Sequence, residues 1–256
     1  MSDHRFRSTT RQRLAAALAT LLLAGASATQ AQQAARPSAH ASPLTTADPS
    51  GWVQTNTPSG RIDSGNPFFR SFGSNGRSCD SCHRQAQGWS ISPDELRQRF
   101  ARTNGTDPIF ALVDGAVSPV ADVSSVYARR NAYAMLLSRG LLRVGMPMPA
   151  NAEFRLSKVD DPYGYASARE LSLFRRPLPA TNLVWLTAVM WDGRETFTPF
   201  RPPMDAGIDM ENLRVSLASQ ARHAILGHEQ ATAAPDDAVI GQIVDFEMHL
   251  FTAQVD

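Results

Sequence analysis

Two cysteines and a histidine stand close enough together in the sequence to act on one prosthetic group. The 256 residues contain two cysteines, Cys79 and Cys82, and His83 follows the second directly. At the spacing C-x-x-C-H, two thiols can form thioether bonds to the edge of a porphyrin, which holds the adjacent imidazole under the iron. The motif therefore predicts covalent attachment of one haem c per chain through Cys79 and Cys82, with His83 as the proximal iron ligand.

A cysteine pair at this spacing also occurs in structural disulfides and in thioredoxin-like redox pairs. Three features favour haem over these alternatives. A histidine follows the pair, the chain has no second cysteine pair that would complete a zinc site, and an export signal precedes the motif. Iron is therefore the expected metal.

The sixth coordination position of the iron would decide the chemistry. A sulfur ligand raises the reduction potential and suits an electron carrier, whereas a histidine or an open position favours a low potential or activation of peroxide. Met146 and Met148 flank Pro147 in a short loop, and His228 is the nitrogen candidate. Methionines that fill gaps in a core, and a histidine on the apolar face of a helix, are the alternatives where no metal is bound.

The first 31 residues have the pattern of a secretory signal peptide. Four arginines precede an apolar run from Leu14 to Ala28, and small residues end at Ala31, with Ala28 as the alternative cleavage point. The run is shorter than the roughly 20 apolar residues of a transmembrane helix. We expect export to the periplasm, removal of residues 1–31 and no transmembrane anchor afterwards, with retention as an uncleaved anchor as the alternative.

The charge balance argues against a nucleic-acid partner. The formal net charge is +1 with neutral histidines, and removal of residues 1–31 takes away four arginines and one aspartate, which leaves −2. Binding to nucleic acid relies on an excess of positive charge. Lys158 is the single lysine, and arginines suit scattered ion pairs and haem propionates better than a polybasic membrane patch.

The remaining sequence predicts a leader followed by one mainly α domain. Residues 32–50 are rich in Ala, Gln, Pro and Ser, which predicts a flexible leader, and residues 51–256 are predicted to form the haem domain. Capping signals and apolar periodicity predict a helix that begins at Pro93 and further helices over 124–138, 211–231 and 235–253. Dense prolines predict mostly irregular structure over 145–182, with a short strand at 153–159.

Two blocks of sequence carry a family resemblance. The first runs over 72–83, and the second, over 187–194, contains Trp191-Asp192-Gly193-Arg194 and follows a proline-rich stretch at 176–182. In this order the blocks resemble those of the bacterial di-haem cytochrome c peroxidases and the related MauG-like proteins. The resemblance covers residues from about 60 to 255 and matches the first haem domain of that family, while the second is absent from this chain.

The resemblance implies a cytochrome c-like domain, with helices wrapped around one haem. Trp191 would be the tryptophan that lies between the two haems of the family, and Arg194 would hold a haem propionate through a charge-assisted hydrogen bond. The alternatives are a buried aromatic residue in an Asp-Gly turn for Trp191 and an ion pair with Asp192 for Arg194. Trp191 and Arg194 are the candidate catalytic residues.

We therefore expect an exported c-type cytochrome that exchanges electrons with small redox proteins. The first alternative is a peroxidase that reduces hydrogen peroxide with electrons from a partner cytochrome. Such an enzyme needs a distal acid–base group, for which Glu195, Glu211 and Glu229 are available. The second alternative is a non-enzymatic haem sensor. Because the second haem motif is missing, the chain is expected to be either a fragment of a two-haem protein or a protein that works with one haem.

Overall fold

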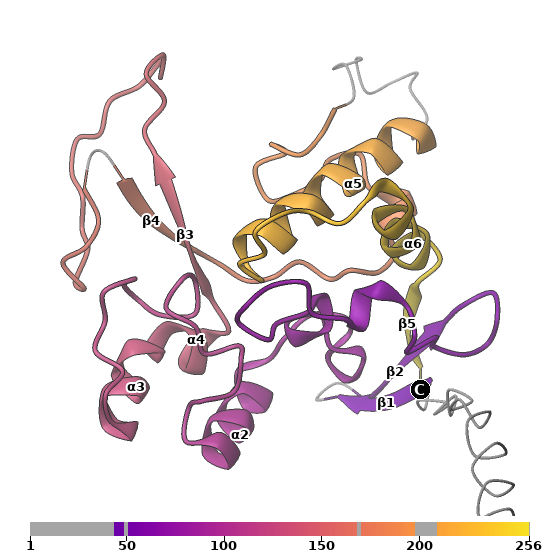
Figure 1. Cartoon of the computed structure of the whole chain (residues 1–256), viewed down its shortest axis with the longest axis horizontal. Helices are drawn as coiled ribbons and strands as arrows, with labels where there is room; N and C mark the ends of the chain where they lie inside the picture. Colours follow the sequence, from indigo (N-terminus) through magenta and orange to yellow (C-terminus); the bar gives the residue numbers. More distant parts are fainter. Residues whose placement is uncertain (1–43, 49–50, 168–169, 198–208, 256) are drawn as a thin grey trace, which may run out of the picture. The chain divides into compact units, whose positions relative to one another are not determined.

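Two antiparallel sheets accompany the helices, so the prediction of a mainly α, cytochrome c-like fold is wrong. A computed structural model describes residues 44–48, 51–167, 170–197 and 209–255, which belong to one compact unit, Ala41–Asp256. These residues contain five α-helices and five β-strands (Figure 1). The fold is therefore a mixture of α and β structure. The predicted signal peptide, residues 1–31, lies outside the described residues.

A three-stranded sheet joins the two ends of this unit. Its strands are β1 (Thr45–Asp48), β2 (Gly51–Asn56) and β5 (Phe251–Val255), in the order β1-β2-β5 with antiparallel neighbours. The expectation that 32–50 is wholly a flexible leader is thus wrong for residues 45–48. The β-branched threonines of β1 suit a strand, and β2 supplies the backbone partners that composition alone could not reveal.

A second, two-stranded sheet lies in the region that was expected to be irregular. β3 (Leu142–Pro147) pairs with β4 (Glu170–Arg175) over six residue pairs, and the predicted strand at 153–159 falls instead in the connection between them. Pro147 is the last residue of β3, a position that needs little from its missing N–H group. The many prolines therefore led to a prediction of irregular structure, although a strand can end at a proline, as β3 does.

Helix α2 (Pro93–Thr103) begins where its capping residues predict. Ser92 Oγ accepts a hydrogen bond from the Glu95 amide, and Pro93 occupies the first helical position. Leu96 and Phe100 are buried, as the spacing indicates. The signals that start this helix are local, which explains why the sequence was sufficient to find it.

The helix predicted over 124–138 is divided in two. α3 (Val126–Ala132) and α4 (Ala134–Arg139) are separated by Tyr133, whose backbone φ and ψ of −100° and 22° leave helical geometry. The Tyr133 side chain is buried, and its hydroxyl donates to the Phe110 carbonyl at 2.7 Å. A tertiary hydrogen bond thus accompanies the break.

Helices α5 (Met210–Gly227) and α6 (Asp237–Met248) pack together and carry much of one apolar core (Figure 1). α5 ends before the predicted limit at residue 231, and the last predicted helix ends at Met248, after which β5 begins. Within the described part of the chain, no helix combines the length and the apolar character that crossing a membrane requires.

Candidate haem site

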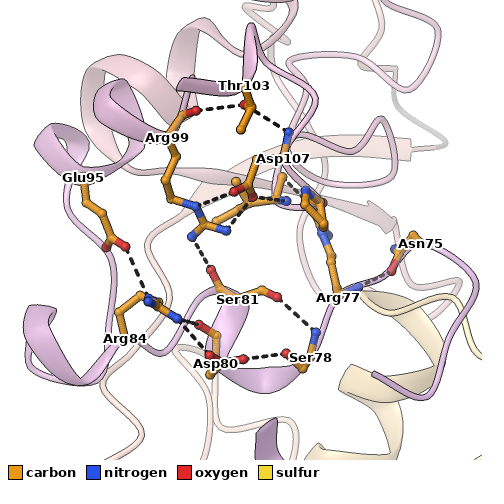
Figure 2. A network of polar contacts seen from close by, with 12 residues as sticks. Asn75, Arg77, Ser78, Asp80, Ser81, Arg84, Glu95, Arg99, Thr103 and Asp107 are labelled. Carbon is orange, nitrogen blue, oxygen red and sulfur yellow. Dashed lines mark hydrogen bonds and ion pairs between the residues drawn. The ribbon is translucent and has the colours of Figure 1, made fainter. Parts of the chain in front are cut away.

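The motif begins in a single 3₁₀ turn, η2 (Cys79–Ser81), which local side chains stabilise. The Ser78 amide donates to Ser81 Oγ at 3.0 Å, and Ser78 Oγ donates to Asp80 Oδ1 at 2.5 Å (Figure 2). The His83 amide donates to the Cys79 carbonyl at 3.0 Å. One short turn therefore presents both thiols and the imidazole.

Two arginines connect this turn to α2. Arg84 forms ion pairs with Asp80 at 2.8 Å and with Glu95 of α2 at 3.3 Å (Figure 2). Arg99 of α2 donates from Nη1 to the Ser81 carbonyl at 2.7 Å. The motif is therefore fixed to the helix by several polar contacts, and its position does not rest on apolar packing alone.

The orientation of His83 suits a metal ligand. Its Nδ1 lies 3.0 Å from the Trp89 carbonyl oxygen, and because a carbonyl can only accept, Nδ1 carries the proton. Nε2 then holds the lone pair that a metal requires. Burial lowers the pKa of His83, more than the hydrogen bond to Trp89 raises it, and the charge of His228 lowers it further. The imidazole is therefore neutral at neutral pH.

Both thiols are free and protonated at neutral pH. Burial raises the pKa of Cys82 to about 11. Burial also raises the pKa of Cys79 well above its ordinary value, with further contributions from the negative charges of Glu247 and Glu229. A thioredoxin-like redox pair depends on a cysteine whose pKa is lowered. The environment of this pair therefore argues against the thioredoxin alternative.

The two thiols border different apolar cores. Cys79 packs against the cluster formed by α5, α6, Phe68 and Trp89, whereas Cys82 packs against the cluster around α2 and α4. Apolar side chains on both sides are the surroundings that a porphyrin ring needs. The motif thus lies where the two cores approach each other.

His228 is the second imidazole of the site. It caps the C-terminus of α5, and its Nδ1 lies 2.5 Å from Asp114 Oδ2. The carboxylate accepts this bond, so in the neutral imidazole of His228 the lone pair lies on Nε2. Arg77 donates to the other oxygen of Asp114 at 2.6 Å, and both of these partners are buried. His228 is therefore oriented by a buried ion pair.

Two buried carboxyl groups lie near Cys79. Glu229 Oε1 lies 4.0 Å from Cys79 Sγ, and Glu229 Oε2 accepts from the Phe72 amide at 2.8 Å. Burial raises the pKa of Glu229 to about 7. Burial also raises the pKa of Glu247 to about 8, and its Oε2 is buried without a hydrogen-bond partner. Both groups can hold a proton at neutral pH.

Two of the other candidate residues, Met146 and Arg194, contact each other in a separate cluster. Met146 Sδ accepts from Arg194 at 3.6 Å and from Arg175 at 3.7 Å, and Arg194 also pairs with Asp192 at 3.4 Å. Trp191 is 61% exposed, so the alternative of a buried aromatic residue is wrong. For Arg194, the ion pair with Asp192 that the alternative predicted is present, and the contact with a haem propionate stays a prediction.

The remaining acid–base candidates differ in their surroundings. Glu195 is buried and accepts from His223 at 2.8 Å and from Ser219 at 2.9 Å. Glu211 lies exposed in the first turn of α5. Glu229 is thus the one of the three that lies beside the motif.

Sequence reasoning missed Arg77, Asp114 and Glu247. Arg77 stands two residues before the motif, which is a weak signal, whereas Asp114 and Glu247 stand 35 and 168 residues from Cys79 with no pattern around them. Their roles depend on burial and on contacts that only the tertiary structure creates.

The residues of the motif fit a covalently bound haem. Both thiols are available, His83 presents Nε2, and apolar cores border the turn. The described residues contain no group of three or more His, Cys, Asp or Glu that could bind a bare metal ion. An iron held by a porphyrin does not need such a group, because the porphyrin nitrogens supply four ligands. Two cavities of about 390 and 480 Å³, both lined in part by Tyr163, lie away from the motif.

Comparisons with known proteins found no matching family model, no matching curated protein and no matching solved structure.

Proposed function

We propose that this protein binds one haem c covalently through Cys79 and Cys82, with His83 as the proximal ligand, and transfers electrons. The observation that carries the proposal is the hydrogen bond from His83 Nδ1 to the Trp89 carbonyl at 3.0 Å. This bond fixes the tautomer and the ring orientation of an imidazole that follows two thiols at the haem-attachment spacing. When bound, the haem supplies a one-electron couple between ferric and ferrous iron.

For the sixth position we favour His228 over Met146 and Met148. The neutral His228 imidazole, which donates from Nδ1 to Asp114, has its lone pair on Nε2, and His228 lies close enough to act on His83 electrostatically. Met146 Sδ instead accepts from two arginines, and Met148 lies beyond the end of β3. A second histidine ligand would give a lower potential than methionine.

Peroxide reduction is the second candidate function, and Glu229 is the observation that favours it. A peroxidase needs a group that takes a proton from one peroxide oxygen and gives it to the other. With a pKa of about 7 next to His228, Glu229 can both accept and donate a proton near neutral pH. The resemblance of the two sequence blocks to di-haem peroxidases supports the same candidate.

The proposal includes export to the periplasm and small redox proteins as electron donors or acceptors. The signal-peptide pattern of residues 1–31 supports export. The net charge of −2 after removal of those residues gives no support to a nucleic-acid partner.

The test is expression of the full chain in a bacterium that carries the c-type haem attachment machinery. We expect peroxidase-stained haem to remain with the polypeptide on a denaturing gel, and one haem per chain by the pyridine haemochrome assay. The variant Cys79→Ala/Cys82→Ala should lose covalent haem, because no other thiols exist.

The control is His83→Ala, which keeps both thiols. It should keep measurable covalent haem but change the absorption spectrum, because the proximal nitrogen is lost. Purified wild-type chain without covalent haem would overturn the proposal. Rapid steady turnover of hydrogen peroxide with a reduced donor would select the peroxidase over the electron carrier.

A further inference from the structure

The side chain of Asp114 is shared between the motif segment and the end of α5. Oδ1 accepts from Arg77 at 2.6 Å, and Oδ2 accepts from His228 Nδ1 at 2.5 Å. Asp114 and Arg77 are 3% and 1% exposed, whereas the side chain of His228 is 47% exposed. The exposed imidazole is thus held by a fully buried pair.

Arg77 holds the Asp114 carboxylate in one orientation, because the guanidinium is itself fixed by other contacts. Its guanidinium also donates to the carbonyls of Pro108 at 2.8 Å and Ile109 at 2.5 Å. Because the Arg77 guanidinium pairs with the other oxygen of Asp114, the group that accepts from His228 is a carboxylate.

The backbone of His228 is held from the same side. Asn75 Nδ2 donates to the His228 carbonyl at 2.8 Å, and Arg77 Nη1 donates to it at 3.3 Å. The loop that leads into the motif therefore contacts His228 through its backbone, while Asp114 contacts it through its ring. These contacts fix both the position and the tautomer of the imidazole.

We propose that Asp114, held by Arg77, is a positioning residue that orients the His228 imidazole, so that its Nε2 lone pair would be available to the haem iron. This inference rests on the proposed function. A carboxylate that accepts from Nδ1 makes Nε2 a stronger donor, as carboxylate–histidine pairs do at metal sites. Asp114 thereby favours the hexacoordinate, low-spin form and lowers the reduction potential.

The first test uses Asp114→Asn in the full haem-loaded chain. We expect the wild type to be low-spin with two nitrogen ligands in electron paramagnetic resonance, and the variant to show a high-spin fraction and a higher midpoint potential. In a His228→Gly background, Asp114→Asn should cause no further change, because the effect passes through the imidazole. The control, Asp245→Asn, removes the partner of Arg214 without touching the motif or His228, and should keep the wild-type spectrum.

The second test leaves the buried pair intact and does not depend on the folding of Asp114→Asn. In His228→Gly, added imidazole can donate a hydrogen bond to Asp114, whereas 1-methylimidazole binds iron but has no N–H group. A charge-assisted hydrogen bond predicts at least about tenfold tighter binding of imidazole. In His228→Gly/Asp114→Asn, where that chain folds, the ratio should shrink.

Equal affinities of the two ligands in His228→Gly would overturn the inference, as would a wild-type spectrum that shows methionine or an open sixth position. A shift in Asp114→Asn that persists in the absence of His228 would show a purely structural role and would also overturn it. The haem stain separates these outcomes from failure of the proposed function, because a chain without covalent haem fails before any ligand is tested.

Discussion

At the scale of single residues, burial decides which groups around the motif carry charge. His83 is held neutral and both thiols stay protonated, while Asp114 remains ionised because Arg77 and His228 face it. Glu247 has no such partners, and burial alone holds it in its protonated form. Around the motif, Asp114 is therefore ionised and paired, whereas His83, the two thiols and Glu247 are neutral at neutral pH.

The raised pKa of Glu247 predicts that the protein loses stability as the pH rises. An ordinary glutamate in the unfolded chain releases its proton near pH 4.5, whereas Glu247 in the folded chain keeps it to about pH 8. Between these values the folded state binds more protons, so the free energy of unfolding falls as the pH increases and levels off above the folded pKa. Glu247→Gln cannot ionise and should gain stability relative to wild type across this window, by up to about 1.4 kcal/mol per pH unit.

Urea unfolding of both chains between pH 5 and pH 8 measures this difference. The control is Glu211→Gln, because Glu211 is exposed and its replacement should leave the pH dependence unchanged. Parallel pH profiles for wild type and Glu247→Gln would contradict the prediction.

At the scale of elements, the loop that leads into the motif, the approach loop, packs its backbone at Gly73 directly against the backbone at Glu229, just after the end of α5. A Cβ atom built on Gly73 would lie 1.6 Å from the Glu229 carbonyl oxygen. The Glu229 side chain also accepts a hydrogen bond from the Phe72 amide. This bond holds the two segments together, and the space beside Gly73 is too small for a side chain. A glycine is needed here for close approach, whatever its dihedral angles.

Gly73→Ala should therefore separate the approach loop from α5. Because the clash is with backbone, it cannot be relieved by a side-chain rotation, and we expect a loss of at least about 1–3 kcal/mol in the free energy of unfolding. The yield of covalent haem should fall as well. Urea unfolding and the haem stain measure the two effects.

The matched control is Gly241→Ala in α6, where a new Cβ meets nothing within 4 Å. Alanine is the better helix former, so this variant should gain roughly 0.5–1 kcal/mol. Wild-type stability and haem content in Gly73→Ala would show that the loop can move without cost.

At the scale of the whole molecule, the surface offers a candidate contact for a partner protein at Trp191. Trp191 is 61% exposed, and its Nε1 donates to the Arg176 carbonyl at 2.9 Å. The neighbouring ion pair of Arg175 with Asp192 at 2.9 Å stabilises the same turn. An exposed indole that is fixed at one end suits contact with a partner protein.

If a redox partner docks at Trp191, then Trp191→Ala should slow electron exchange with a reduced small cytochrome c. An aromatic side chain at the centre of an interface predicts an effect of about tenfold on the second-order rate constant. Stopped-flow mixing at constant ionic strength measures it. Trp185→Ala is the control, since Trp185 is 63% exposed and its ring instead contacts Phe251. Equal rates for wild type and Trp191→Ala would remove this residue from the docking surface.

The sequence by itself determined the features whose signals are local. The capping residues predicted where α2 begins, and the spacing of Cys79, Cys82 and His83 indicates haem attachment, which stays a prediction. Apolar periodicity also located most of α5 and α6. In each case the interacting residues lie within a few positions of one another, so their types and spacing carry the information.

Tertiary structure alone decided the two sheets and the surroundings of the motif. β2 pairs with β5 from the other end of the chain, with Trp52 opposite Val255, and no local pattern selects such a partner. The buried pair of Arg77 with Asp114, the tautomer of His228 and the protonation of Glu247 depend on burial among distant segments. Strand pairing and desolvation are properties of the folded chain. Whether a strand edge is paired and whether a charged group is removed from water both depend on segments far away in the sequence.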